Sequence, residues 1–147
     1  LSLTAAVAAC GGAVLSGPPK PPFAPGQEWS VTSTQPTTMK VIIGRVEPWN
    51  GEIAVHVTVI DIVAPPGALN AGRTITIGHM PFEQSAFAAS VSQLLATDVP
   101  LPAIFEEGYR DWRQAKGGIY TISVAKAVAT GLEMMKRHPE NRADQRR

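Results

Sequence analysis

The sequence contains one cysteine, Cys10, in 147 residues. A single thiol excludes a disulfide within the chain and a zinc site built on two or four cysteines. Only 17% of the residues are charged and 6% are aromatic, while 44% are hydrophobic. This composition indicates a packed body with a sparsely charged surface, and the length is enough for one domain with a real core.

Basic charge is scarce outside the C-terminal end. The formal net charge is +1, but five of the 13 basic residues and only two of the 12 acidic ones lie from Lys136 onward. The remainder is slightly acidic, with eight basic and ten acidic residues. Nucleic-acid binding needs a clustered basic face, so we expect no nucleic-acid partner. Residues 138–147 are predicted to form a disordered basic tail.

Familiar catalytic and ligand-binding motifs are also lacking. The sequence has no Gly-x-Ser-x-Gly, no His-Glu-x-x-His, no phosphate-binding loop and no calcium loop. No second apolar run after the N-terminal one is long enough to span a membrane. We therefore expect no cofactor and no metal, and the sequence favours a binding module over an enzyme.

The N-terminal segment is apolar and built of small residues up to Cys10. Val7-Ala8-Ala9-Cys10 resembles the lipobox of bacterial lipoproteins, in which the signal peptide is cut before a cysteine that becomes lipidated. Two or three acyl chains anchor a protein stably. Gly11 after the cysteine implies sorting to the outer membrane, with the body facing the periplasm. The alternative is a cytoplasmic protein with an N-terminal helix and an ordinary buried cysteine.

The anchor prediction divides the chain into four parts. Residues 1–9 are expected to be a partial signal peptide and residues 10–26 a lipidated cysteine with a tether. Five prolines between Ser16 and Gly26 indicate a semi-rigid polyproline II spacer. A single domain is predicted over residues 27–137, followed by the tail.

The stretch Met39–Ile62 predicts a β-hairpin at the centre of that domain. Two alternating apolar runs flank Asn50-Gly51, the pair that best suits a two-residue type I′ turn. A two-residue loop fixes the register of the strands. The pairs predicted on the core face are Val46 with Val55, Gly44 with Val57 and Ile42 with Val59.

The other face of the hairpin is mixed apolar and polar, and His56 is predicted there opposite Arg45, exposed to solvent. A monomer exposes such a patch only if something uses it, so we expect a protein partner from the envelope. The predicted binding surface consists of Val41, Ile43, Arg45, His56, Thr58 and Ile60.

The remaining elements follow from periodicity and breakers. Strands are predicted around Trp29–Val31 and at Arg73–His79, where apolar residues alternate. Helices are predicted at 83–96, at 103–115 and, capped by Ser123, at 124–137. Strands therefore come first and helices second, which is typical of an α+β fold. We expect an antiparallel sheet of about four strands with two or three helices packed on one face.

Three segments resemble a family of short, uncharacterised bacterial proteins. They are Gly78-His79-Met80-Pro81-Phe82, the run from Phe105 to Arg113, and the run from Gly118 to Val124. The resemblance covers the chain from Gln27 to about Met135. It implies one compact α+β domain and no catalytic assignment.

His79 is the side chain most open to a chemical role. It is predicted at a strand-to-helix junction, four residues before Glu83, on the face of Ile75 and Ile77. A histidine and a carboxylate so placed could perform acid–base chemistry or hold a metal. The simpler interpretation is a structural histidine, because spacing places no third ligand and no nucleophile.

Three classes of function remain open. The leading prediction is a non-enzymatic envelope lipoprotein that binds a macromolecule in the periplasm. A small enzyme or metal-dependent protein centred on His79 is the first alternative. A structural component of the envelope is the second.

Overall fold

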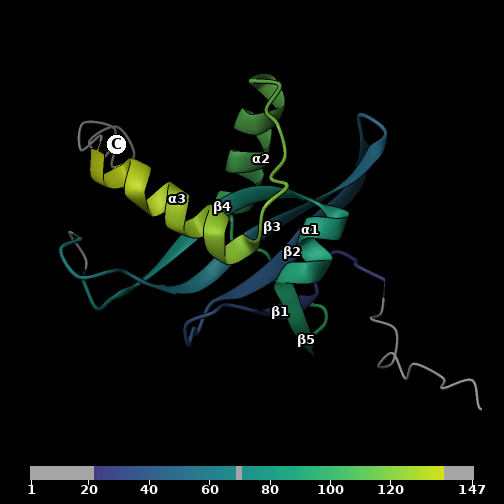
Figure 1. The fold of residues 1–147 in the computed structure, drawn as a ribbon. Coiled ribbons are helices and arrows are strands. Elements are labelled where there is room, and N and C mark those ends of the chain that lie inside the picture. Colours follow the sequence, from purple (N-terminus) through teal and green to yellow (C-terminus); the bar gives the residue numbers. More distant parts are fainter. Residues whose placement is uncertain (1–21, 69–70, 138–147) are drawn as a thin grey trace, which may run out of the picture.

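The computed structural model describes residues 22–68 and 71–137 (Figure 1). They form an antiparallel five-stranded sheet in the order β4-β3-β2-β1-β5, together with three helices. The predicted α+β class is therefore confirmed, with five strands where about four were expected. The elements are β1 (Glu28–Val31), β2 (Lys40–Trp49), β3 (Glu52–Val63), β4 (Thr74–Glu83), α1 (Gln84–Ser90), β5 (Val91–Ala96), α2 (Ile104–Gln114) and α3 (Val124–Arg137). Cys10 and the predicted tail lie outside the described residues.

The β2–β3 hairpin turns at Asn50-Gly51, as predicted. Both residues have positive φ, 44° at Asn50 and 82° at Gly51, which is the backbone of a type I′ turn. Next to the turn the predicted register holds, because Val46 pairs with Val55. The local turn chemistry therefore decides the pairing at this end of the hairpin.

Farther from the turn the predicted register is wrong by one residue. The pairing shifts between Ile43 and Arg45, so that Ile43 faces Val57. A β-bulge of this kind moves the following side chains to the opposite face of the strand. It forms at Gly44, where a Cβ atom would lie only 2.3 Å from the ring of Phe105. At the bulge, the Phe105 ring of α2 can therefore pack directly on the backbone of β2.

Helices lie on both faces of the sheet: α1 and α3 pack on one face, as predicted, and α2 packs on the other. Val55, Val57 and Val59 pack with residues of α1 and α3 in the main hydrophobic core. His56 lies between Val55 and Val57 in β3 and so points to the other face, where its ring contacts Tyr109 of α2. Figure 1 shows α1 and α3 in front of the strands, whereas α2 lies away from these two helices.

The predicted helix over residues 83–96 is wrong in its second half. Helix α1 ends at Ser90, and β5 follows directly. β5 pairs with the free edge of β1, with Val31 opposite Val91. The buried Ser90 hydroxyl donates to the Ala86 carbonyl oxygen at 2.7 Å and accepts the Val124 N–H at 3.0 Å. Edge pairing with β1 thus overrides the local helical pattern.

The packed body begins before the predicted boundary at Gln27. The Phe23 ring lies 5.4 Å from Trp29 and 4.8 Å from Phe87, both edge-on. The Gln27 side chain donates to the Pro22 carbonyl oxygen at 3.0 Å and accepts the Trp29 indole N–H at 3.0 Å. Phe23, which was assigned to the tether, therefore packs against the hydrophobic core.

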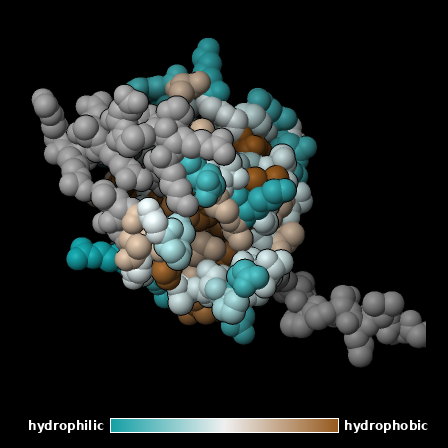
Figure 2. Space-filling model, turned by 60° about the vertical axis from the view of Figure 1, so that its left-hand side comes forward, coloured by the Kyte–Doolittle hydropathy of each residue, from teal (hydrophilic) through white to brown (hydrophobic). Residues whose placement is uncertain are grey.

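Exposed hydrophobic side chains are scattered over the described residues. The most exposed are Met134 at 61% and Val63 at 53%. On the face drawn in Figure 2, hydrophobic residues reach the surface in separate patches among hydrophilic ones. Within residues 22–68 and 71–137, no helix combines the length and the apolar character needed to cross a bilayer.

Candidate functional site

The site lies where α2 packs on the face of the sheet opposite to α1 and α3. Glycines allow the close approach, because a Cβ at Gly78 would lie 2.7 Å from Ile104 and a Cβ at Gly108 would lie 2.7 Å from the His79 Cβ. Only glycine tolerates such contacts. The Phe105 ring is fully buried below the helix. The helix is therefore held against the part of the sheet that carries His56 and His79.

His56 and His79 form a directly hydrogen-bonded pair under α2. The His56 Nδ1 and His79 Nε2 atoms are 2.9 Å apart, and the two rings are nearly parallel, at 19°. His56 is completely buried, whereas His79 is only partly buried. The pair therefore joins the interior of the protein to a more accessible imidazole.

The inner end of the pair meets a carboxylate. His56 Nε2 lies 3.1 Å from Glu47 Oε1. This is an ion-pair distance, but the N–H is not aligned on the oxygen, so His56 Nε2 forms no well-directed hydrogen bond. The negative charge nevertheless favours the proton on Nε2, which leaves Nδ1 to accept the His79 N–H. The chain then runs from His79 through His56 to Glu47.

The carboxylate is held from its other side by α2. The Tyr109 hydroxyl lies 2.9 Å and 3.1 Å from the two carboxylate oxygens of Glu47. The Arg113 guanidinium donates to the Tyr109 oxygen at 3.0 Å, and the Arg45 guanidinium lies 4.3 Å from the Tyr109 ring centre. Two cations thus surround Tyr109, which in turn fixes the orientation of Glu47.

Burial controls the charge of both histidines. It lowers the pKa of His56 to about 4, with a further lowering by Arg45 and a partial opposing effect from Glu47. It also lowers the pKa of His79 to about 4, helped by the neighbouring His56. Removing an imidazolium from water disfavours its charged form. Both rings are therefore neutral at pH 7, and each keeps one unprotonated nitrogen there.

His79 lines an open pocket of about 300 Å³. Its Nε2 is committed to His56, and its Nδ1 has no hydrogen-bond partner among the described residues. The other walls are the side chains of Trp112 and Tyr120, with Pro81 and Ile119 between them. A ligand in this pocket would meet a neutral imidazole set among aromatic and apolar groups.

The sequence identified His79 but paired it with the wrong carboxylate. β4 continues to Glu83 instead of ending at His79, and four residues of strand span about 13 Å. The Glu83 carboxylate accepts a hydrogen bond from Ser85 at 2.6 Å and makes no interaction with His79. The carboxylate of the site is Glu47, which reaches His79 only through His56. No spacing signal connects Glu47 with His79, because three strands and a helix bring them together.

The predicted partner surface is not exposed. Among its six residues, Val41, Ile43, His56 and Thr58 are completely buried. Arg45 and Ile60 are partly buried. The bulge turns Val41 and Ile43 into the main core, while α2 covers His56. Arg45 does pair with His56, as predicted.

In the part of the chain that the structure describes, no group of three histidine, cysteine or acidic side chains is arranged to hold a metal ion. The 2.9 Å separation of the two imidazole nitrogens is a hydrogen-bond distance. Comparison of the chain with protein-family models, with curated proteins and with solved structures gave no match.

Proposed function

We propose that the body of this protein is an acid–base module in which His79 accepts a proton from a small ligand bound in its pocket. The observation that carries this proposal is the hydrogen bond from His79 to the buried His56, whose other nitrogen faces Glu47. Such a chain orients the His79 ring and assigns the proton to its Nε2, which leaves Nδ1 as the basic nitrogen.

The surroundings support a chemical role over a purely structural one. Two imidazoles and a carboxylate held between a sheet and a helix are costly to bury, and an apolar core would serve packing as well. Strongly shifted histidines that line a cleft are typical of functional sites. The site replaces the predicted partner surface, whose residues are mostly buried.

A reporter ester tests the module without knowledge of its natural ligand. Neutral imidazole promotes hydrolysis of 4-nitrophenyl acetate, and release of nitrophenol is followed optically. We expect a rate that rises to half its plateau near pH 4, because the pKa of His79 is about 4. An imidazole in free solution would give a midpoint near 6.5.

The sequence offers a matched control, because its third histidine is His138. His79→Gln should reduce the rate at pH 6 at least tenfold, while His138→Gln should leave the plateau unchanged. His56→Gln should lower the rate by removing the acceptor of the His79 N–H. A rate that survives His79→Gln, or a midpoint near 6.5 that disappears with His138→Gln, would exclude a proton acceptor at this site.

The location in the bacterial envelope stays a prediction from the sequence around Cys10. Its test is labelled palmitate, which should enter the wild-type chain and be absent from Cys10→Ser. Incorporation that persists in the variant would remove the argument for an outer-membrane lipoprotein facing the periplasm. The acid–base proposal for His79 does not depend on that result.

A further inference from the structure

A second hollow shares one lining residue, Trp112, with the His79 pocket. Its volume is about 430 Å³, which is within the range of small-molecule sites. It is bounded by the tip of the β2–β3 hairpin and by the C-terminal end of α2. The lining residues that matter for its chemistry are Trp49, Asn50, Trp112, Arg113, Lys116 and Glu47.

Two indole rings form walls of this hollow. Trp112 is fixed, because its Nε1–H donates to the Gly118 carbonyl oxygen at 2.9 Å and its ring fills the space where a Gly117 Cβ would stand. Trp49 is partly exposed at the end of β2 and makes no ring contact among the described aromatic residues. A partly exposed tryptophan without a ring partner leaves an open face on which a planar ligand can stack.

The charge of the lining is unbalanced toward positive. Arg113 donates to the Tyr109 hydroxyl and forms no ion pair with a described carboxylate, and Lys116 forms none either. The Glu47 carboxylate is the negative group of the lining, and it is already engaged by Tyr109. The lining thus carries two positive charges and one negative charge.

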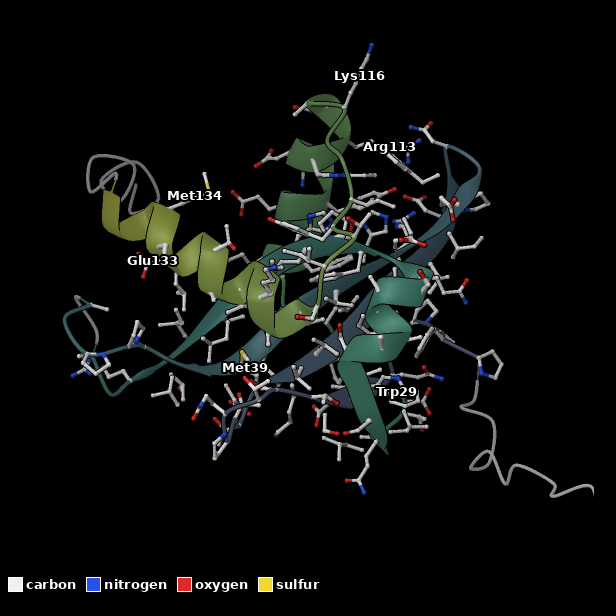
Figure 3. All side chains as sticks on the ribbon, in the orientation of Figure 1. Trp29, Met39, Arg113, Lys116, Glu133 and Met134 are labelled. Atoms are coloured by element: carbon white, nitrogen blue, oxygen red, sulfur yellow. The ribbon has the colours of Figure 1, made fainter. Side chains whose placement is uncertain are left out.

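The two cations are placed differently. Figure 3 shows Arg113 extending from α2 toward the hairpin tip, and Lys116 pointing away from the body at the end of the helix. Arg113 is therefore the fixed cation, and its planar guanidinium can bind a carboxylate through two parallel hydrogen bonds. Lys116 also has a positive φ of 51°, a conformation more usual for glycine or asparagine. Its flexible stem can bring the ammonium group to the same anion.

We infer that this hollow binds a planar aromatic monoanion, whose ring stacks on Trp49 and Trp112 and whose carboxylate pairs with Arg113. The inference does not rest on the acid–base role of His79, which lines the other pocket. The Asn50 side chain supplies a further polar group at the rim.

The test uses 2-naphthoate and its neutral amide, 2-naphthamide, with the full chain labelled for nuclear magnetic resonance. The three tryptophans give separate indole N–H signals. We expect 2-naphthoate to shift the signals of Trp49 and Trp112 and to leave that of Trp29, which is 1% exposed, in place. The amide should bind about tenfold more weakly, because it loses a charge-assisted pair.

Matched variants separate charge from stacking. Arg113→Gln should abolish the preference for the carboxylate. Arg110→Gln, three residues earlier on α2, should keep it, because Arg110 is also exposed but does not line the hollow. Trp49→Leu should weaken both ligands about tenfold by removing a stacking face. Lys116→Gln should weaken only the carboxylate, by about twofold.

Three results would overturn the inference. One is equal affinity for 2-naphthoate and 2-naphthamide. Another is a carboxylate preference that survives Arg113→Gln. The third is a titration with 2-naphthoate that, at saturation, shifts only the signals of residues around the His79 pocket. Trp49→Leu changes a partly exposed residue at the end of β2, so it stays informative if the Arg113 variant fails to fold.

Discussion

Placing a methyl group at Gly44 should expel the Phe105 ring from its seat on the sheet. The added Cβ would lie 2.3 Å from the Phe105 Cζ and 2.6 Å from both Cε atoms, which is well inside contact distance. Gly44 does not have a positive φ, so alanine suits its backbone, and the Phe105 ring supplies the three closest contacts of the added Cβ. Overpacking of a dense core costs about 1–3 kcal/mol, and Gly44→Ala should lower the free energy of unfolding by that amount.

A double-mutant cycle isolates this contact. Phe105 is fully buried, so Phe105→Ala alone should cost about 3–5 kcal/mol. Once the ring is absent, the three atoms nearest to the new methyl group at position 44 are gone. The double variant should therefore be no less stable than Phe105→Ala, which gives a coupling of about 1–3 kcal/mol.

Urea unfolding followed by circular dichroism measures these differences, with a constant m-value as the check that both folded states are comparable. Gly131→Ala is the control, because no atom lies within 4 Å of the added Cβ in α3. That variant should gain about 0.5–1 kcal/mol from helix propensity. If the effects of Gly44→Ala and Phe105→Ala add within about 0.5 kcal/mol, the Phe105 ring of α2 does not pack on Gly44 of β2.

Three further substitutions or conditions test other parts of the fold. Gly51→Val should cost about 1–3 kcal/mol or more, because a β-branched residue resists the φ of 82°, and a thermal melt that barely moves would contradict the turn. Ile43→Asp should unfold the domain, because the Ile43 side chain is completely buried. Ile60 is only partly buried, so Ile60→Asp should lower the free energy of unfolding less. Equal urea midpoints of the two variants would show that Ile43 is accessible. The folded pKa values of His56 and His79, about 4, lie below the unfolded value of 6.5. Their contribution to the free energy of unfolding is therefore complete above pH 6.5 and falls as the pH drops toward 4. Replacing both histidines by glutamine should flatten this pH dependence, as measured by urea titrations.

The candidate site shows where sequence reasoning stops. His79 could be singled out because an ionisable residue follows an alternating apolar run. Its partner could not, since His56 lies 23 residues away and was predicted to face solvent. Glu47 and Tyr109 are separated by 62 residues, and only the packing of α2 on the sheet joins them. Pairings of this kind leave no periodicity to detect.

Local chemistry by itself determined the elements whose signals lie within a few residues. Asn50-Gly51 specifies the hairpin turn, because these residues readily adopt positive φ. Ser123 specifies the start of α3, where its hydroxyl accepts the Lys126 N–H at 3.2 Å. The apolar stripe of Phe105 and Tyr109 specifies α2 and its buried side. Each of these features was predicted correctly.

Tertiary structure alone decided the rest. The bulge at Gly44 depends on a ring from α2, and β5 exists because β1 offers it a free edge. In both places, backbone hydrogen bonds and packing between distant segments override the local conformational preference. These interactions outweigh strand propensity, which spans only roughly 1 kcal/mol. The same packing covers the second face of the sheet and buries His56. It thereby brings His79, His56 and Glu47 into one chain of contacts, of which His79 lines the pocket.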